Sequence, residues 1–398
     1  MNRANSTSPG LSTIQVGALV VGVLGVVLSI VAAVINVEQF YESYIFGFLF
    51  WVELSLGCLA LLMIHNLVNG RWGFAVRRFL AAGARTIPLM ALLFVPIIFG
   101  LGTIYEWAAA PAAPGPLQNS DFYLAPPFFI IRAVVFFAIW IALAYLITGW
   151  SYKHDETADP QLLVRIRQLS VAGMILFMIT ASLAAIDWNM SLVPDWFSSV
   201  FGWLTISREV LLAFGFALIV LALVWNTRPL ADVLNNRAMT DLAALLLVFV
   251  MIWTYLSFIQ YVVMWSANLS SKVVWYTIHF AGSWSGFFML LVAVQAAVLL
   301  LLMVPGLKKN RGVLVGLAAL LIVLRLGEMF WLVMPIYRPG FSLQWQDLAI
   351  VVGIGGLWVA FFLWSLVGNS LVPINHPALN EHATGHGGEE YVSSPQVS

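Results

Sequence analysis

The sequence predicts an all-α integral membrane protein with ten transmembrane helices. Of the 398 residues, 62% are hydrophobic and only 9% are charged, whereas a soluble domain carries roughly 25% charged residues. Ten apolar runs are long enough to cross a bilayer core, which takes about 20 helical residues. The net charge of zero, with 18 basic and 18 acidic residues, argues against a nucleic-acid partner.

The ten apolar runs follow one another with short connections. They cover residues 13–37, 44–68, 84–106, 124–150, 166–187, 198–225, 241–266, 273–304, 312–334 and 346–369. The first run follows a polar segment, residues 1–12, and is too long for the core of a signal peptide, so we expect a retained helix. Residues 373–398 form a polar tail after the last run.

Basic residues gather in alternate connections and predict the topology. Four connections hold twelve of them: Arg71, Arg77, Arg78 and Arg85, then Lys153, Arg165 and Arg167, then Arg228 and Arg237, then Lys308, Lys309 and Arg311. The opposite connections hold only Lys272 and Arg338. Since basic connections stay in the cytoplasm, both termini are predicted to be cytoplasmic.

Nine ionisable side chains lie inside the apolar runs or at their ends. They are Glu53, Glu106, Arg132, Asp187, Arg208, Glu209, His279, Arg325 and Glu328. A charge near mid-membrane costs at least ~2.5–3.5 kcal/mol on insertion scales, so such groups must be paired or functional. Counting ~1.5 Å per residue from the predicted helix ends places all nine in the outer half of the membrane. This charged layer is the candidate site.

The partners of these charges remain open at this stage. Glu53 is either protonated, bonded to backbone or serine groups, or paired with Arg132 or Arg208 at similar depth. Arg325 and Glu328 share a helix face, either as an ion pair that locks two helices or with Glu328 exchanging protons. Arg208 and Glu209 point about 100° apart and need different neighbours. Asp187, at an outer helix end, is placed either to accept protons from solvent or simply at the membrane interface.

Two adjacent runs carry polar residues at helical spacing. One holds Thr254, Ser257, Gln260, Tyr261 and Met264, and the next holds His279, Gly282, Ser283 and Gly286. Such a wall would suit a quinone head group or a file of water molecules. Ordinary hydrogen bonding between helices explains the same pattern.

Redox metals are not expected in this chain. The membrane histidines, His65 and His279, fall near opposite surfaces of a ~30 Å bilayer and cannot ligate one haem iron together. The only cysteine, Cys58, cannot make a metal cluster alone. The tail residues His376, His382, His386, Glu381, Glu389 and Glu390 could bind a metal weakly or be plainly solvated.

Two patterns concern packing. Phe46-Gly47 and Phe201-Gly202 each precede a charge, Glu53 or Arg208, which stands six residues after the glycine. This repeat fits either chance or a duplication of helices 2–5 as helices 6–9. The first run carries a stripe of small residues, namely Ala18, Gly22, Gly25, Ser29 and Ala32. The stripe allows close helix packing, against a partner subunit or within the chain.

Three stretches resemble a known family. They are GRWGFAVRRFLAAGARTIPL (70–89), DWNMSLVPDWFSSVFG (187–202) and SFIQYVVMWSANL (257–269). They resemble the polysulfide-reductase/NrfD-type membrane subunits, specifically the second such subunit of bacterial alternative complex III. The resemblance implies two four-helix bundles, 44–187 and 188–334, flanked by helix 1 (13–43) and helix 10 (335–372). By resemblance, Asp187 matches the aspartate that opens the family string.

The resemblance also implies a function. Such a subunit belongs to a respiratory or photosynthetic complex of the bacterial cytoplasmic membrane that oxidises quinol and reduces a cytochrome c-type acceptor. The expected partners are a sister NrfD-type subunit, an iron–sulfur subunit and multihaem cytochrome c subunits. The charged layer, with Gln260, would then serve proton translocation or bind a quinone such as menaquinone. The alternatives are an assembly scaffold and a secondary transporter, the latter disfavoured because no matching pair of broken helices stands at mid-membrane.

Overall fold

The computed structural model describes residues 9–109, 122–225, 236–267, 270–307 and 310–366, and the elements within these ranges are helices. Ten helical spans in them are long and apolar enough to cross a membrane, which confirms the predicted number. The predicted polar tail and its histidines lie outside the described residues, as does most of the N-terminal segment.

The helices follow the predicted order. They are α1 (Pro9–Ile35), α2 (Val37–Val68), α3 (Arg71–Ala84), α4 (Ile87–Leu93), α5 (Val95–Phe99), α6 (Leu101–Ile104), α7 (Glu106–Ala109), α8 (Pro126–Thr157), α9 (Pro160–Trp188), η1 (Met190–Leu192), α10 (Phe201–Val224), α12 (Asn236–Ala267), α13 (Ser270–His279), α14 (Trp284–Met303), α15 (Arg311–Tyr337) and α16 (Trp345–Leu366).

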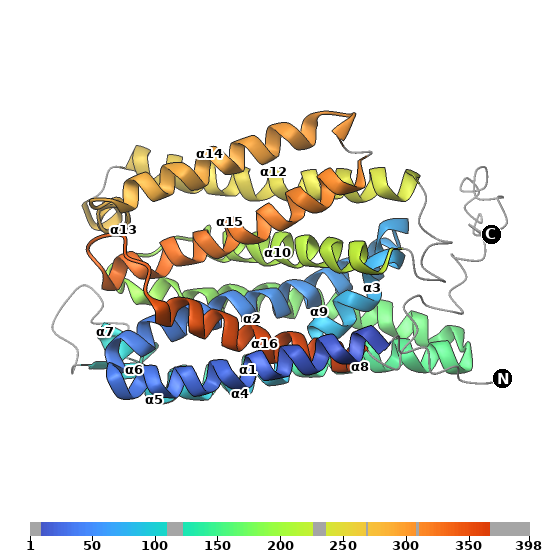
Figure 1. Cartoon of the computed structure of the whole chain (residues 1–398), viewed down its shortest axis with the longest axis horizontal. Helices are drawn as coiled ribbons and strands as arrows, with labels where there is room; N and C mark the ends of the chain where they lie inside the picture. The colour runs from blue at the N-terminus through green and yellow to red at the C-terminus, as the bar shows by residue number, and fades with distance from the viewer. Residues whose placement is uncertain (1–8, 110–121, 226–235, 268–269, 308–309, 367–398) are drawn as a thin grey trace, which may run out of the picture.

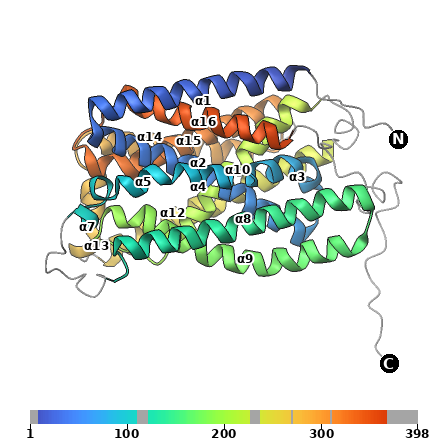
Figure 2. The same ribbon diagram turned by 90° about the horizontal axis from the view of Figure 1, so that it is seen from below.

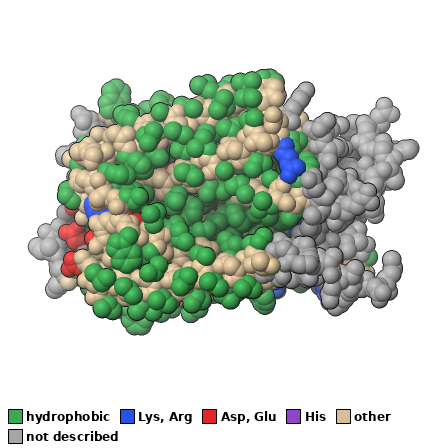
Figure 3. Space-filling model, in the orientation of Figure 1, with side chains coloured by type: hydrophobic (Ala, Val, Ile, Leu, Met, Phe, Trp, Pro, Cys, Tyr) green, Lys and Arg blue, Asp and Glu red, His purple; other side chains and the backbone are tan. Residues whose placement is uncertain are grey.

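The long helices run lengthwise beside one another, and the start of α1 and the end of α16 lie at the same end of the molecule (Figure 1). The pair α1 and α16 forms one edge and the pair α8 and α9 the opposite edge (Figure 2). The face seen in Figure 3 is largely hydrophobic, and the charged side chains visible on it lie near the two ends. This distribution suits a bilayer around the middle of the molecule.

The centre of the bundle is the contact between α2 and α10. In the apolar 18-residue stretch of α2, 94% of the residues are buried inside the protein. Each of these two helices also packs against both α9 and α15. Gly57 allows the close approach, because a Cβ at this position would overlap the backbone carbonyl of Glu209 on α10. Side chains at the middle of α2 therefore meet those of three other helices.

Several helix boundaries differ from the prediction, and three of the differences concern the candidate site or the predicted topology. The third span runs over Trp72–Phe99 rather than 84–106, so Arg77 and Arg78 are buried on α3 instead of lying in a connection. The predicted run 273–304 is broken between α13 and α14, where Gly282 has a φ of 53°. Helix α2 begins at Val37, seven residues before the predicted start, because Asn36 caps it.

The small-residue stripe of α1 faces α16 within the chain. A Cβ on Gly22 would lie 2.6 Å from the backbone nitrogen of Leu357, and one on Gly25 would overlap the Cα of Gly353. Glycines on both helices therefore let the two backbones touch. Of the two predicted alternatives, the structure shows the contact within the chain.

Candidate functional site

Five of the predicted charges form a buried cluster between α2, α10 and α15. We call Glu53, Arg208, Glu209, Arg325 and Glu328 the central network; each is at most 8% exposed. Glu53 stands sixteen residues after the start of α2, or about 24 Å along the helix. Its carboxyl, like those of Glu209 and Glu328, stands farther from a helix end than Asp187, the last residue but one of α9. The predicted place of all nine charges in the outer half of the membrane stays a prediction.

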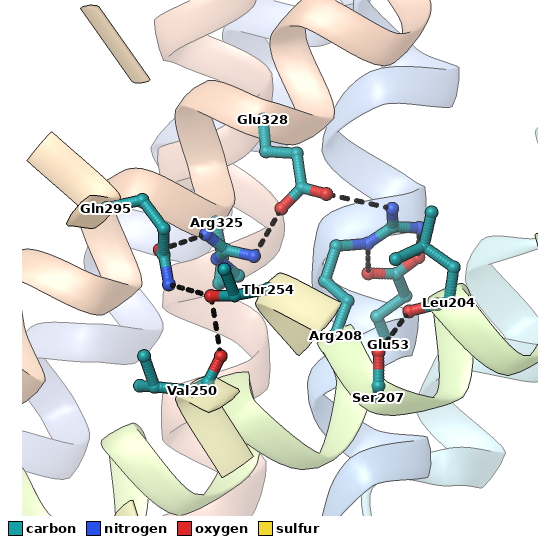
Figure 4. A network of polar contacts seen from close by, with 9 residues as sticks. All are labelled: Glu53, Leu204, Ser207, Arg208, Val250, Thr254, Gln295, Arg325 and Glu328. Atoms are coloured by element: carbon teal, nitrogen blue, oxygen red, sulfur yellow. Dashed lines mark hydrogen bonds and ion pairs between the residues drawn. The ribbon is translucent and has the colours of Figure 1, made fainter. Parts of the chain in front are cut away.

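Arg208 is the centre of this network (Figure 4). Its Nε lies 2.8 Å from Glu53 Oε2 and its Nη2 2.5 Å from Glu53 Oε1, a bidentate pair. The third nitrogen, Nη1, lies 3.5 Å from Glu328 Oε1. Of the two arginines that the sequence offered to Glu53, the structure pairs it with Arg208. One guanidinium thus joins carboxylates from two other helices.

Arg325 extends the network on its other side. Its Nη1 lies 2.6 Å from Glu328 Oε2, a close ion pair whose angles do not make a hydrogen bond. Its Nη2 donates to Gln295 Oε1 over 2.8 Å, and the amide of Gln295 donates to Thr254 Oγ1 over 3.4 Å. The guanidinium lies 3.7 Å from the ring centre of Trp253, a cation–π contact. The predicted contact of Arg325 with Glu328 is present.

Glu209 follows Arg208 on α10, but the side-chain hydrogen bonds of Arg208 go to Glu53 and Glu328 instead. It lines a cavity of about 20 Å³ between α2, α9 and α10, together with Glu53, Asn189 and Thr205. In the described part of the chain, Glu209 Oε2 has no hydrogen-bond partner, and neither do Thr205 Oγ1 and Asn189 Nδ2. The cavity therefore has polar walls whose hydrogen-bonding capacity is unused.

Arg132 and Asp187 form a separate pair nearer the predicted outer end. Arg132 Nε lies 2.7 Å from Asp187 Oδ2 and Nη2 lies 3.1 Å from Oδ1. The remaining Nη1 donates to the carbonyl of Tyr123 over 2.6 Å, and the ring of Tyr123 covers the guanidinium. Asp187 is fully buried, so the structure does not present it to solvent as a free proton acceptor.

A second pair at this end was missed in the sequence. Arg338 Nη1 lies 2.8 Å from Asp347 Oδ2, Nη2 lies 3.0 Å from Oδ1, and Nε lies 3.2 Å from Glu42 Oε2. Asp347 also accepts from the Ser43 hydroxyl over 2.6 Å and from the backbone N–H of Gln344 over 2.8 Å. The available signal was Arg338, one of only two basic residues on the predicted outer side. We call Arg132–Asp187 and Arg338–Asp347 the outer-end pairs.

The predicted polar wall does not assemble into one site. Gln260 accepts from Ser198 over 2.6 Å, whereas Thr254 belongs to the Arg325 contacts described above. The two ring nitrogens of His279, on α13, face the carbonyls of Trp275 at 2.7 Å and Leu332 at 3.0 Å. Ordinary hydrogen bonding between neighbouring segments accounts for these contacts.

The remaining predicted site residues lie apart from the central network. His279 is buried and stacks on Trp275 with ring centres 3.8 Å apart. Helix α13 lies outside the ten spans, and burial lowers the pKa of His279 to about 4. Glu106 is exposed at the start of α7. His65 packs on Trp72 and Phe74 in the last turn of α2.

The two clearest cavities of the described part are small. They measure about 10 and 20 Å³, whereas pockets for small organic ligands measure roughly 300–1,000 Å³. The cavity beside the central network therefore has room for water rather than for a quinone ring. No protein-family model matches the sequence, and no curated protein matches it either.

Proposed function

We propose that this chain is an NrfD-type membrane subunit of a bacterial quinol:cytochrome c-type oxidoreductase complex, and that its central network takes part in proton transfer. The three sequence stretches at 70–89, 187–202 and 257–269 and the ten helical spans support the family. Quinol oxidation releases protons, so a membrane subunit without redox centres has a clear task beside the electron-carrying partners.

The observation that carries proton transfer is the charge count of the central network. Three carboxylates, Glu53, Glu209 and Glu328, share two guanidiniums, Arg208 and Arg325, within a site that is almost closed to solvent. A network that served only to hold helices together would be more stable with equal numbers of carboxylates and guanidiniums, because an unbalanced charge is costly in the membrane. The surplus acid therefore needs a proton, which is the species that quinol oxidation supplies.

Helix contacts support the proposed two-bundle arrangement. Helices α2 and α10 contact each other, and each packs against both α9 and α15. Exchanging α2 with α10 and α9 with α15 leaves this contact pattern unchanged, as a duplication of helices 2–5 and 6–9 requires. Glu53 and Arg208, which occupy matching places after Phe46-Gly47 and Phe201-Gly202, meet at the shared interface. We propose that both termini of this duplicated fold are cytoplasmic.

Quinol binding within this chain has less support than proton transfer. The cavity beside the network is far too small for a quinone head group. We therefore propose that the quinol site belongs to the sister subunit or to an interface with it. The iron–sulfur and multihaem cytochrome c partners implied by the sequence resemblance would carry the electrons.

An assembly scaffold is the second candidate, and the outer-end pairs favour it. Arg132 and Asp187 are joined by two hydrogen bonds, and so are Arg338 and Asp347. Their carboxylates lack free capacity for exchange and tie α8 to α9 and the end of α15 to α16. The same chain can therefore combine structural ion pairs with a functional network.

Four single substitutions in the native complex test the proposal: Glu53→Gln, Asp187→Asn, Glu209→Gln and Glu328→Gln. With complex yield measured first, quinol turnover and proton release are then compared with the native protein. We expect about hundredfold or larger losses for the three network variants, in the range of general acid–base catalysis, and near-native turnover for Asp187→Asn. Native turnover and proton release in all four assembled variants would leave only the scaffold role.

A further inference from the structure

The cavity beside Glu209 has the size of a hydration site. Four polar residues line it, Glu53 from α2, Asn189 after α9, and Thr205 and Glu209 from α10. The rest of its wall is apolar apart from the indole N–H of Trp188. Its volume is about 20 Å³, and one water molecule needs at least about 10–15 Å³. We call it the Glu209 cavity.

The walls of the Glu209 cavity need a polar occupant. Four of its residues, each at most 6% exposed, have a buried atom without a hydrogen-bond partner among the described residues: Glu209 Oε2, Thr205 Oγ1, Asn189 Nδ2 and Trp188 Nε1. Buried polar atoms rarely lack a partner, and ordered water is the usual remedy. Four such atoms around one water-sized space identify a built site.

The kinds of atoms decide which occupant fits. Asn189 Nδ2 is an N–H donor and needs an acceptor, whereas Glu209 Oε2 is a carboxyl oxygen and the Thr205 hydroxyl can do either. A metal cation accepts no hydrogen bond and would face the Asn189 donor unfavourably. A water molecule can accept from Asn189 and still bond to Thr205 and Glu209.

The charge distribution selects the carboxyl that holds the proton. Arg208 binds Glu53 through two nitrogens and Glu328 through the third. Arg325 lies against Glu328. Glu209 Oε2, in contrast, receives no guanidinium hydrogen bond in the described structure. Since the network has one more carboxyl than guanidinium, Glu209 is the residue left to be neutralised by a proton.

We propose that Glu209 carries the exchangeable proton of the central network and that one water molecule in the Glu209 cavity passes it on. This inference rests on the proposed function. The O–H bond of Glu209 breaks as an O–H bond to the water forms, and the water releases one of its own protons to further water toward Asn189. One proton moves and no electron does, while Glu53 and Arg208 remain paired as a fixed charge.

The experiment compares native and variant complexes by infrared difference spectroscopy in H₂O and D₂O. Glu209→Gln is expected to remove the C=O band of a buried protonated carboxylic acid, which Asp187→Asn, in an outer-end pair, should keep. Ala184→Val adds apolar volume to the cavity wall and should remove the O–H band of the trapped water and lower proton release about tenfold. Ala172→Val, at an exposed position of the same helix, is the matched control and should change neither.

Thr205→Val keeps the shape of the side chain and serves if Ala184→Val lowers the yield of complex. A protonated-carboxyl band that survives in Glu209→Gln would overturn the proposal. So would thermal stabilisation of the complex by Na⁺ that Glu209→Gln abolishes, since it would show a cation in the cavity. If Glu209→Gln lost the C=O band but released protons at the native rate, Glu209 would still be the protonated residue. The proposed function in proton transfer would then be overturned.

Discussion

The central network and the outer-end pairs are both built from arginines and carboxylates but differ in how fully the buried carboxyl oxygens are bonded. In the outer-end pairs, one arginine holds one buried aspartate through two hydrogen bonds, and Asp347 is further satisfied by Ser43 and Gln344. In the central network, three carboxylates share two arginines, and Glu209 Oε2 remains unpartnered in the described structure beside a cavity. Burial alone does not separate the two regions.

Depth explains why this difference matters. Near a membrane surface, water and head groups can reach a poorly paired charge, so an imbalance there costs little. At mid-membrane the same imbalance costs several kcal/mol, and it persists only if a proton neutralises it or function requires it. A surplus acid in the deeper region is therefore a stronger sign of activity than a close ion pair near the surface.

The largest predicted effect is the loss of Arg208. Arg208→Met would leave Glu53 and Glu328 buried without their shared cation, and removing one partner of a buried pair costs about 3–5 kcal/mol. The matched substitution Arg132→Met should cost less, about 1–3 kcal/mol, because Asp187 lies nearer the membrane surface. Thermal unfolding of the purified proteins in detergent gives both values. Equal losses would contradict the importance of depth.

A second prediction concerns His279, at the predicted outer end. Its neighbours are the rings of Trp275 and Trp331 and two backbone carbonyls. Since burial lowers its pKa from 6.5 to about 4, the unfolded chain binds a proton first as the pH falls, and the folded protein loses stability between pH 6.5 and 4. At ~1.36 kcal/mol per unit, the total loss is about 3 kcal/mol.

The control for His279 is the variant His279→Gln, whose amide can still donate to a carbonyl. Unfolding midpoints measured across pH 4–6.5 should fall less in this variant than in the native protein. An equal fall of the unfolding midpoint with pH in both proteins would show that a group other than His279 titrates.

A third prediction tests the close packing that positions the network. Gly57→Ala places a Cβ against the Glu209 carbonyl and must separate α2 from α10, at a cost of about 1–3 kcal/mol. Gly149→Ala is the matched control, because nothing lies within 4 Å of a Cβ at that position. It should be neutral or slightly stabilising. Unfolding of both variants in the same detergent checks the difference.

Sequence reasoning reached the number of spans because hydropathy reports burial in lipid directly. It also found the Arg325–Glu328 contact, since residues three apart on a helix share a face. It could not choose between Arg132 and Arg208 for Glu53, because that choice depends on which helices are neighbours. The Glu53–Arg208 pair joins residues 155 positions apart, a distance that no local pattern encodes.

The start of α2 was misjudged for a local reason that the sequence contains. Helix α2 begins after Asn36, whose side chain accepts from the backbone N–H of Gln39 and caps the helix. Asparagine before a helical pattern is a start signal, but the polar residues that follow it, including Glu38 and Glu42, lowered the hydropathy of the first turns. With these turns included, Glu53 stands near the middle of α2.

The smallest predicted effect belongs to Glu42, the most exposed carboxylate that contacts an outer-end pair. Its side chain is 21% exposed and its contact with Arg338 is 3.2 Å long, so Glu42→Gln should change the free energy of unfolding by at most about 1 kcal/mol, as for exposed ion pairs. Asp347→Asn is the comparison: its carboxylate is fully buried, and its loss should cost more. Since Glu42 makes this arginine cluster acidic by one charge, a large effect of Glu42→Gln on stability or proton release would show that surplus acid matters at the surface too. Depth would then no longer separate the two regions.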